Sequence, residues 1–491
     1  MPDKHRQILE DERDLHRWGY AQQLLRDMGG FANFAVSFTI ISILTGAITL
    51  YGQGLGFGGP AVNGLGWPLV TFFTLLVAAS MAEIASAVPT AGAVYHWAAL
   101  LGGPGWGWFT AWFNFVGQLA TTAGIDYGIA LFMVDLLNLG PGALLPIYGL
   151  LLLSHGLFNH YGIRTVAALN DLSVWYHVAV TLLLVAGFLL FAPRQPLSFA
   201  FKTGFTTSQV PYAWAFLIGL LQAQWTLTGY DASAHITEET VDPRRNAPWG
   251  MFNAVLISGV FGYLLLLAVT LGIQDLPAAA GAPNPFIHIA ERAFGPKAGK
   301  ALVWAILPAM WFCGLSSVTA NARMIFAFAR DRGLPGSSLL ARVSPRYRTP
   351  APAVWLSVGL AFLIALYSQA YGVIVSLSTI GLYVSYVIPI LLVLRARRRG
   401  QWREIGPWNL GPWGGLVNAL AALWVAFITV LFVAPPNQRT GYTFAGLSAL
   451  LGLYYLAWVR GRFEGPKRLS TEEELMRVEE DLQKTALYHE A

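Results

Sequence analysis

The sequence of 491 residues predicts an all-α polytopic membrane protein with twelve transmembrane helices, arranged as a five-plus-five inverted repeat in which helices one and six are discontinuous. Hydrophobic residues make up 55% of the chain and charged residues 12%, whereas a soluble chain averages roughly 25% charged residues. Mean hydropathy is +0.52. Apolar windows of about 20 residues, long enough to cross a bilayer, recur along the chain, and two of them are interrupted near their middle.

Reading these windows in order predicts the span boundaries. The spans are expected near residues 34–60, 67–88, 105–137, 143–159, 164–192, 211–236, 247–272, 299–328, 351–368, 371–394, 414–434 and 441–459. The corresponding organisation is a cytoplasmic N-terminal segment 1–33, a transport core 34–394 made of halves 34–192 and 211–394, two accessory helices within 414–459, and a cytoplasmic tail 460–491.

The loops predict the orientation. Most of the 31 lysines and arginines fall in the segments on the same side as the two termini, and positive charge marks the cytoplasmic side. We therefore expect a multi-pass protein of the plasma (inner) membrane with both termini in the cytoplasm. The net charge of +5 then records topology and lipid contact, and no nucleic-acid partner is expected.

Span one is the first interrupted helix. Ser42, Thr45 and Gly46 stand near its middle, where an ordinary span stays apolar. Interruptions at matching positions of two halves are the best sequence indication of a transporter's central site. We therefore expect Ser42, Thr45 and Gly46 to contribute to a substrate site.

Spans two and three carry further polar residues. Glu83, near the cytoplasmic end of span two, is either a proton carrier or an acceptor that anchors a neighbouring loop. Asn114 and Gln118 lie four residues apart on one face of span three, where they either contact substrate or bond to another helix. Asp126 lies nearer the outer end of span three and is expected to cap the outer vestibule.

Span six is the second interrupted helix. An Asp within a span indicates a functional site, and irregular backbone at membrane depth is tolerated only where it lines a cavity or is buried in protein. The polar run after the apolar start of this span includes the residues expected at the substrate site, namely Trp225, Thr228, Gly229, Tyr230 and Asp231.

The run GYDASAHITEETVDPRRNAP at 229–248 resembles the sixth-span signature of the amino acid–polyamine–organocation superfamily of permeases. Its residues are most similar to those of the amino acid/choline transporter branch. Glu83 followed by Pro-Thr-Ala-Gly, Tyr-Gly-Ile-Arg at 161–164 and AFARDRGLP at 327–335 are similar to other motifs of that family. The resemblance covers roughly residues 30 to 460. It implies the inverted-repeat fold, alternating access and import of amino acids or related amines.

The same resemblance suggests two coupling sites. Where several proton-coupled family members carry a lysine, seven positions after the Asn that matches Asn170, this chain has His177, which is either the carrier of the coupled proton or a neutral core histidine. Ser316 and Ser317 stand where sodium-coupled relatives bind their ion, and they either hold sodium or pack helices.

The two breaks together predict the mechanism. A free helix N-terminus around Thr45 and Gly46 suits a carboxylate, and unwound carbonyls around Trp225 to Thr228 suit an ammonium, so the pair of breaks suits an amino acid. Asp231 either favours cationic ligands as a cavity carboxylate or supports the unwound loop by hydrogen bonds, and the second is favoured.

The predicted function is therefore import of amino acids or related amines, with γ-aminobutyrate-like or neutral amino acids favoured, coupled to protons or alternatively to sodium. A choline or polyamine permease of the same fold is the alternative, and a non-transporting sensor or channel is the other class. No enzyme is expected, because the nine histidines are scattered. No cofactor or metal is expected, because the GxGxxG match at 54–59 has no preceding strand. The single cysteine, Cys313, is expected to be packing.

Overall fold

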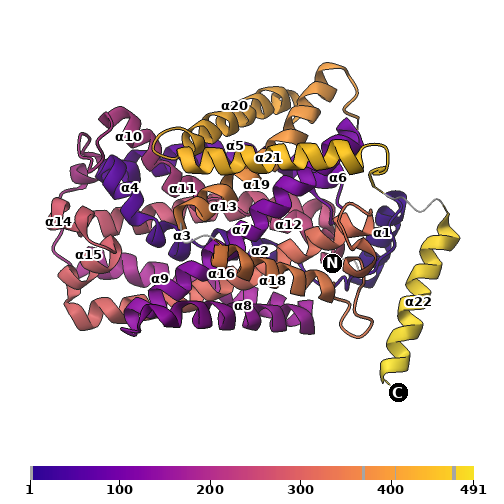
Figure 1. Cartoon of the computed structure of the whole chain (residues 1–491), viewed down its shortest axis with the longest axis horizontal. Helices are drawn as coiled ribbons and strands as arrows, with labels where there is room; N and C mark the ends of the chain where they lie inside the picture. The colour runs from indigo at the N-terminus through magenta and orange to yellow at the C-terminus, as the bar shows by residue number, and fades with distance from the viewer. Residues whose placement is uncertain (1–3, 368–370, 404, 467–470, 491) are drawn as a thin grey trace.

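The computed structural model is a bundle of helices that describes residues 4–367, 371–403, 405–466 and 471–490. The first residues of the predicted N-terminal segment, residue 368 of predicted span nine and residues 467–470 and 491 of the predicted tail lie outside the described residues. The described part of the chain consists of helices and loops and contains no strand; Met28 and Thr240 form an isolated bridge. Both termini lie at the right-hand end of the bundle in Figure 1. We call this the terminal end.

Ten helices of the described chain are long and apolar enough to cross a membrane. They are Gly30–Thr49 (α2, Gly30–Ile41, with α3, Ile43–Thr49), Val62–Ala87 (η1, Val62–Gly66, with α5, Trp67–Ala87), α7 (Pro104–Leu136), Pro141–Tyr161 (η2, Pro141–Ala143, with α8, Leu144–Tyr161), α9 (Ile163–Leu190), α13 (Pro243–Leu271), α16 (Pro296–Arg330), α19 (Tyr371–Arg398), Gly411–Val433 (η5, Gly411–Trp413, with α20, Gly414–Val433) and Gln438–Val459 (α21, Gln438–Tyr454, with η6, Tyr455–Val459).

The other two predicted spans are shorter for different reasons. Predicted span nine is α18 (Ala351–Tyr367), an apolar helix of 17 residues. Predicted span six is divided into α10 (Tyr212–Gly219), α11 (Leu221–Thr226) and α12 (Ala232–His235). The polytopic helical fold is confirmed, and so are the interruptions of helices one and six, whereas the count of twelve spans stays a prediction.

Short helices occupy the ends of the bundle. They are α1 (Lys4–Arg17), α4 (Tyr51–Gly58), α6 (Val94–Gly102), η3 (Leu197–Phe201), η4 (Thr237–Glu239), α14 (Leu276–Gly281), α15 (Pro285–Phe294), α17 (Ser337–Leu340) and α22 (Glu472–Glu490). Helices α4, α10, α14 and α15 lie together at the left-hand end in Figure 1, opposite the termini. The bundle therefore has one end built from helical loops and one end built from the two terminal segments.

Long helices pack in pairs around the two interrupted ones. Helix α7 runs against α19 and α16, and α13 runs against α5 and α2. The interrupted helix α2–α3 packs on α16 and α13, and α11 packs on α3. Both breaks are thus enclosed by continuous helices, which is the condition under which unwound backbone is tolerated at membrane depth.

Candidate functional site

The first break lies at Ser42, between α2 and α3. Ser42 has φ 31° and ψ 83°, a left-handed conformation that is rare for a residue with a side chain. Its hydroxyl compensates by capping the new helix, since it accepts the Thr45 N–H at 3.3 Å and lies 2.6 Å from Thr45 Oγ1. The predicted interruption of span one is therefore a single residue in the left-handed conformation, after which a new helix begins at Ile43.

The second break runs from Leu227 to Asp231, between α11 and α12. Gly229 has φ +92°, and a Cβ there would overlap Ile40 of α2, so both backbone conformation and close approach require glycine. Two threonines, one in α11 and one just after it, bond to carbonyls in the last turns of this helix. Thr226 Oγ1 donates to Gln222 O at 2.8 Å, and Thr228 Oγ1 donates to Gln224 O at 2.6 Å.

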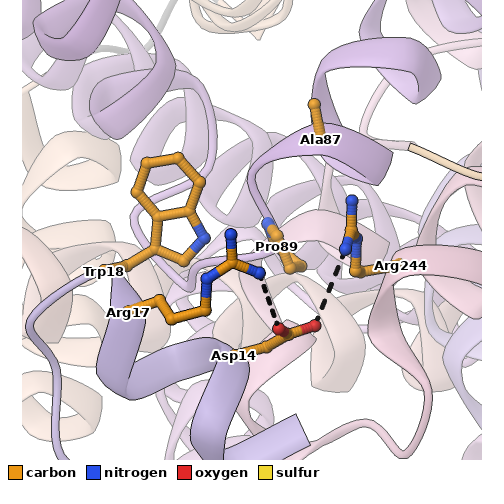
Figure 2. A pocket seen from close by; sticks show the side chains of 6 residues that line it. All are labelled: Asp14, Arg17, Trp18, Ala87, Pro89 and Arg244. Carbon is orange, nitrogen blue, oxygen red and sulfur yellow. Dashed lines mark hydrogen bonds and ion pairs between the residues drawn. The ribbon is translucent and has the colours of Figure 1, made fainter. Parts of the chain in front are cut away.

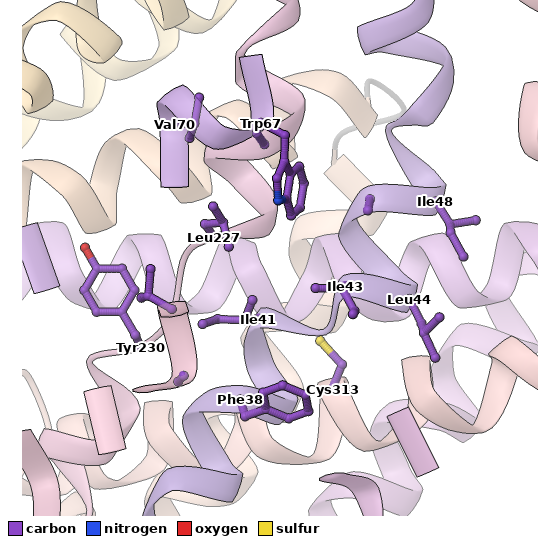
Figure 3. Close-up of a cluster of buried hydrophobic side chains, with 14 of the residues drawn as sticks. Phe38, Ile41, Ile43, Leu44, Ile48, Trp67, Val70, Leu227, Tyr230 and Cys313 are labelled. Carbon is purple, nitrogen blue, oxygen red and sulfur yellow. The ribbon is translucent and has the colours of Figure 1, made fainter. Parts of the chain in front are cut away.

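The two breaks touch each other. A Cβ on Gly46 would stand 2.5 Å from Thr226 Oγ1 and 2.8 Å from Thr226 Cγ2, so the Thr226 side chain of α11 lies directly against the backbone of α3. On the far side of the breaks, Ser37 Oγ donates to Tyr230 O at 2.8 Å and ties α2 to the start of α12. Figure 3 shows the apolar side chains around this meeting point, among them Leu227 and Cys313.

Some main-chain groups at the breaks remain free. The N–H groups of Thr45 and Gly46 donate to Ser42 O at 2.8 and 2.9 Å, whereas those of Ile43 and Leu44 make no hydrogen bond to a described residue. The free donors therefore lie two residues earlier than the predicted Thr45 and Gly46. This follows because the first amides of a restarted helix lack intrahelical acceptors.

Carbonyl groups are free on the facing side. The carbonyls of Trp225, Thr226 and Thr228 accept no hydrogen bond from a described residue, while the carbonyl of Leu227 accepts one from Tyr383 OH at 3.0 Å. The helices that carry these groups, α3 and α11, pack against each other.

A cavity lies between the breaks. The total space between its lining atoms is about 280 Å³, but it is so narrow that a sphere the size of water fits at about one position. Its lining residues come from α2, α3, α7, α11 and α16 and from the unwound segment after α11. They are Ile40, Ile41, Thr45, Gly46, Thr121, Ile125, Trp225, Thr226, Thr228 and Cys313. No charged side chain belongs to this lining.

Four of the predicted substrate residues line the cavity, namely Thr45, Gly46, Trp225 and Thr228. The prediction did not select the isoleucines, since apolar residues in a span look like ordinary packing. It assigned Cys313 to packing, although this residue faces the cavity and its Sγ donates to Ile40 O at 3.1 Å. Only the tertiary arrangement distinguishes such residues from lipid-facing ones.

Asp231 lies outside the cavity in a closed hydrogen-bond network. Its Oδ2 accepts from Asn114 Nδ2 at 3.0 Å and from Gln118 Nε2 at 3.1 Å, and its Oδ1 accepts from Tyr386 OH at 2.6 Å. His235 Nε2 lies 3.2 Å from Oδ2. Because the carboxylate is held by four neighbours, this geometry corresponds to the structural alternative for Asp231, Asn114 and Gln118.

The predicted residues Tyr230 and Gly229 also lie outside the lining. The Tyr230 ring is buried and packs against Tyr386, with centroids 5.3 Å apart. Gly229 shapes the unwound backbone without facing the cavity. Span six therefore contributes a lining part, up to Thr228, and a supporting part from Gly229 onward.

Comparison with known proteins agrees with this architecture. Residues 29–454 match the family described as Amino acid permease. The chain belongs to the amino acid permease family. It is 38% identical to Amino-acid permease BAT1 of Arabidopsis thaliana over 92% of this chain and 95% of that protein, and 37% identical to the homologue of BAT1 in Oryza sativa subsp. japonica over 92% and 94%. It is also 26% identical to the GABA-specific permease of Saccharomyces cerevisiae over 93% and 86%.

In this permease His177 contacts the break of helix one. Its Nε2 lies 2.8 Å from Ser42 Oγ, and its Nδ1 lies 2.8 Å from Ser173 O. A carbonyl can only accept, so Nδ1 donates, and in the neutral ring Nε2 accepts from the Ser42 hydroxyl. Both nitrogens of a neutral imidazole are then satisfied, which favours the core-histidine alternative.

Glu83 bonds to a loop. Its Oε1 accepts from Leu410 N at 3.0 Å, and it forms an ion pair with Arg397 of α19. These contacts join α5 to the end of α19 and to the segment that precedes α20. They favour the anchoring alternative over the proton carrier.

The hydroxyls of Ser316 and Ser317 have protein partners. Ser316 Oγ donates to Asn170 Oδ1 and lies 3.0 Å from Phe312 O, while Ser317 Oγ lies 2.8 Å from Thr122 Oγ1. These bonds join α16 to α9 and α7. The arrangement favours packing over sodium binding.

The terminal end of the permease is closed by paired charges. Arg323 donates twice to Glu239, both at 2.8 Å, and Arg330 donates twice to Glu238 at 3.0 and 2.8 Å. We refer to these four residues as the terminal latch. The N-terminal segment covers it, since Arg26 donates to Thr237 O and Thr240 O at 3.1 and 2.5 Å.

A separate pocket, of about 540 Å³, opens beside the latch at the terminal end. Figure 2 shows Asp14 between two arginines, with Arg17 at 3.3 Å and Arg244 at 3.8 Å. Trp18, Ala87 and Pro89 complete its wall. It shares no lining residue with the cavity at the breaks and is polar where that cavity is uncharged.

Proposed function

We propose that this permease is a secondary active transporter that imports amino acids or related amines by alternating access, coupled to protons. The observation that carries the proposal is the meeting of two helix breaks around one small cavity, with free carbonyls of Trp225, Thr226 and Thr228 in its lining and free N–H groups at the adjacent start of α3. An amino acid carries one group for each side.

The free main-chain groups give the proposed pose. The substrate carboxylate accepts from the N–H groups of Ile43 and Leu44, which belong to a new helix start. The substrate ammonium donates to the carbonyls of Trp225, Thr226 and Thr228. Because the cavity holds little more than a water, its walls have to separate before a substrate enters, as alternating access requires.

The uncharged lining favours a neutral amino acid or γ-aminobutyrate over a polyamine. A polyamine carries several positive charges, and the nearby carboxylate, Asp231, is held in its own network. Trp225 is the aromatic residue of the described lining, whereas quaternary ammonium groups are typically held by several rings. The relative described as a GABA-specific permease supports the same substrate class.

The proposed domain division and orientation are consistent with these contacts. The cavity is lined by residues within the proposed transport core, 34–394, and none comes from the proposed accessory helices within 414–459. The terminal end carries the run of basic residues at 395–399, which suits a cytoplasmic face of a plasma (inner) membrane. Protease protection of a tag on either terminus in sealed right-side-out vesicles tests this orientation.

Radiolabelled uptake into proteoliposomes tests the function. The panel contains neutral amino acids, γ-aminobutyrate, putrescine and choline, each with an imposed proton gradient, an imposed sodium gradient or neither. We expect saturable accumulation of a neutral amino acid or γ-aminobutyrate that a proton gradient drives. Accumulation of choline or putrescine alone would establish the alternative substrate class, and ion currents or binding without accumulation would indicate a channel or sensor.

A further inference from the structure

A carboxylate and a histidine meet inside the bundle, away from the terminal latch. Asp126 of α7 and His155 of α8 are both fully buried, and His155 Nδ1 lies 3.1 Å from Asp126 Oδ2. The sequence had predicted Asp126 as a cap of the outer vestibule. That expectation was wrong, because α8 and α16 cover this side chain completely.

The pair is incompletely bonded. Asp126 Oδ1 and His155 Nε2 have no hydrogen-bond partner among the described residues. Gly314 of α16 faces them both, since a Cβ at that position would overlap Asp126 Oδ1 and stand 2.5 Å from His155 Cε1. Trp311 covers the imidazole, with centroids 5.1 Å apart. A titratable pair with two open polar atoms is thus enclosed by apolar surface.

The pair lies directly behind the cavity. Ile125 and Cys313 line the cavity, and their next neighbours along the chain, Asp126 and Gly314, make the contact described above. A movement of α7 or α16 that widens the cavity therefore also moves the walls around the pair. This is the connection that coupling a proton to substrate binding requires.

The titratable groups near the pair determine whether its charge is balanced. Tyr127 of α7, Tyr148 of α8 and Cys313 of α16 are the other titratable groups close to Asp126. Other helices pack on α7, α8 and α16, among them α2, α9, α18 and α19. In the described chain none of them provides an ion-pair partner for Asp126 or His155. With one proton shared, the pair is neutral overall, and without it a buried net charge of −1 is left, which is costly in a low-dielectric interior.

We propose that the Asp126–His155 pair is the proton-binding site of this permease, an assignment that rests on the proposed proton-coupled transport. One proton adds to the pair when water reaches it from the outer side, forming one N–H or O–H bond. The same proton leaves after the cavity opens to the terminal end, and no other bond changes. His177 and Glu83 are less suited, because neutral partners satisfy His177 and an arginine holds Glu83.

Proteoliposomes with the full-length protein test the assignment through two readouts. The first is substrate accumulation driven by a proton gradient, and the second is counterflow of labelled against unlabelled substrate, which needs no net proton movement. Asp126→Asn should lose gradient-driven accumulation and keep counterflow at a rate that no longer depends on pH. His155→Gln should behave in the same way, and it carries the test if Asp126→Asn does not fold.

His177→Gln is the matched control, because it removes another buried histidine that borders helix one. Its uptake should keep the acid stimulation of the wild type between about pH 7.5 and about pH 5.5, on either side of the ordinary histidine range. Normal acid stimulation in both Asp126→Asn and His155→Gln would overturn the assignment while leaving the proposed function intact. A wild-type protein that ignores the proton gradient would overturn both.

Discussion

The terminal latch and the cavity at the breaks lie in the same bundle and use different chemistry. In the latch, Glu239 and Arg323 are fully buried charges joined by two hydrogen bonds. The cavity has no charged lining residue and presents main-chain N–H and carbonyl groups instead. A zwitterion brings both of its own charges, so a site for it needs dipoles of both signs more than fixed ions.

The difference lies in how each region keeps its polar groups stable. A paired charge is stable when buried with its partner and when both are hydrated, and it is unstable between these states. This behaviour suits a closure that is either made or broken. The cavity, in contrast, keeps its dipoles in place because each is part of a helix end.

Breaking one side of the latch should have the largest effect. Arg323→Gln leaves Glu239 buried without its counter-ion, which costs about 3–5 kcal/mol for a buried pair. The double variant Arg323→Gln/Glu239→Gln should recover part of this loss, since two amides can bond to each other. Denaturant titration in detergent measures the free energy of unfolding of the single and the double variant. Equal losses in the single and double variants would contradict the pairing.

Filling the contact between the breaks should have the next largest effect. Gly46→Leu places a side chain where Thr226 already stands at 2.5 Å from the site of a Cβ. Overpacking costs about 1–3 kcal/mol, so uptake should fall by about tenfold or more while the protein still reaches the membrane. Uptake assays with surface-expression measurements check it.

Gly446→Leu provides the control for this change. Gly446 is an exposed residue of α21 with open space around it. Uptake by this variant should match the wild type. Retained uptake in Gly46→Leu would remove the break of helix one from the site.

Thiol labelling links the two regions. Cys313 is the one cysteine of the sequence and lines the cavity, so N-ethylmaleimide reports access to it. Substrate should slow the labelling, and Glu239→Gln, which weakens the latch, should speed it by about fivefold or more if the coupling between the regions exceeds about 1 kcal/mol. Cys313→Ala gives the unlabelled background. A rate that responds to neither change would show that latch and cavity are independent.

An exposed ion pair at the same terminal end should have the smallest effect. The hydrogen bond from Lys4, followed by that from Arg164, lowers the pKa of Asp27 below its ordinary value of 3.8. The stabilisation is therefore present above pH 3.8 and is lost as the pH falls through the lowered pKa. Since the pair is partly exposed, Asp27→Asn should cost about 0.2–1 kcal/mol at neutral pH.

Thermal melting at low and high salt checks this last prediction. High salt should remove most of the difference between Asp27→Asn and the wild type, because exposed charges are screened. The cost of breaking the latch should persist in high salt, since buried pairs are screened much less. An effect of Asp27→Asn that does not change with salt would contradict the prediction, because the ion pairs of Asp27 would then behave like the buried pairs of the latch.

The interruptions themselves could be predicted from sequence because they violate a strong rule. Polar residues and glycine near the middle of an apolar helix, as at Ser42–Gly46 and Thr226–Asp231, have few explanations in a bilayer. The family resemblance, confirmed by the match over residues 29–454, rests in part on the second of these stretches, because its signature begins at Gly229. The predicted boundaries 247–272 lie close to the helix Pro243–Leu271, whereas predicted span one, 34–60, ends well beyond the candidate span Gly30–Thr49.

The role of each polar residue could not be predicted in the same way. Asp231 and Asp126 both look like intramembrane carboxylates in the sequence. Asp231 has four hydrogen-bonding neighbours, whereas Asp126 has His155 and an open oxygen. These partners come from positions up to 155 residues away, as with Tyr386 and Asp231, so no local pattern contains them.

The sequence by itself determined that this chain is a helical membrane protein, that helices one and six are broken, and that it resembles an amino acid permease. These properties follow from the cost of placing polar groups in hydrocarbon, which acts on each segment separately. The tertiary structure alone decided which side chains face the cavity, which charges close the terminal end, and which histidine meets a carboxylate. Those outcomes depend on the rotation of each helix against its neighbours, which a single segment does not encode.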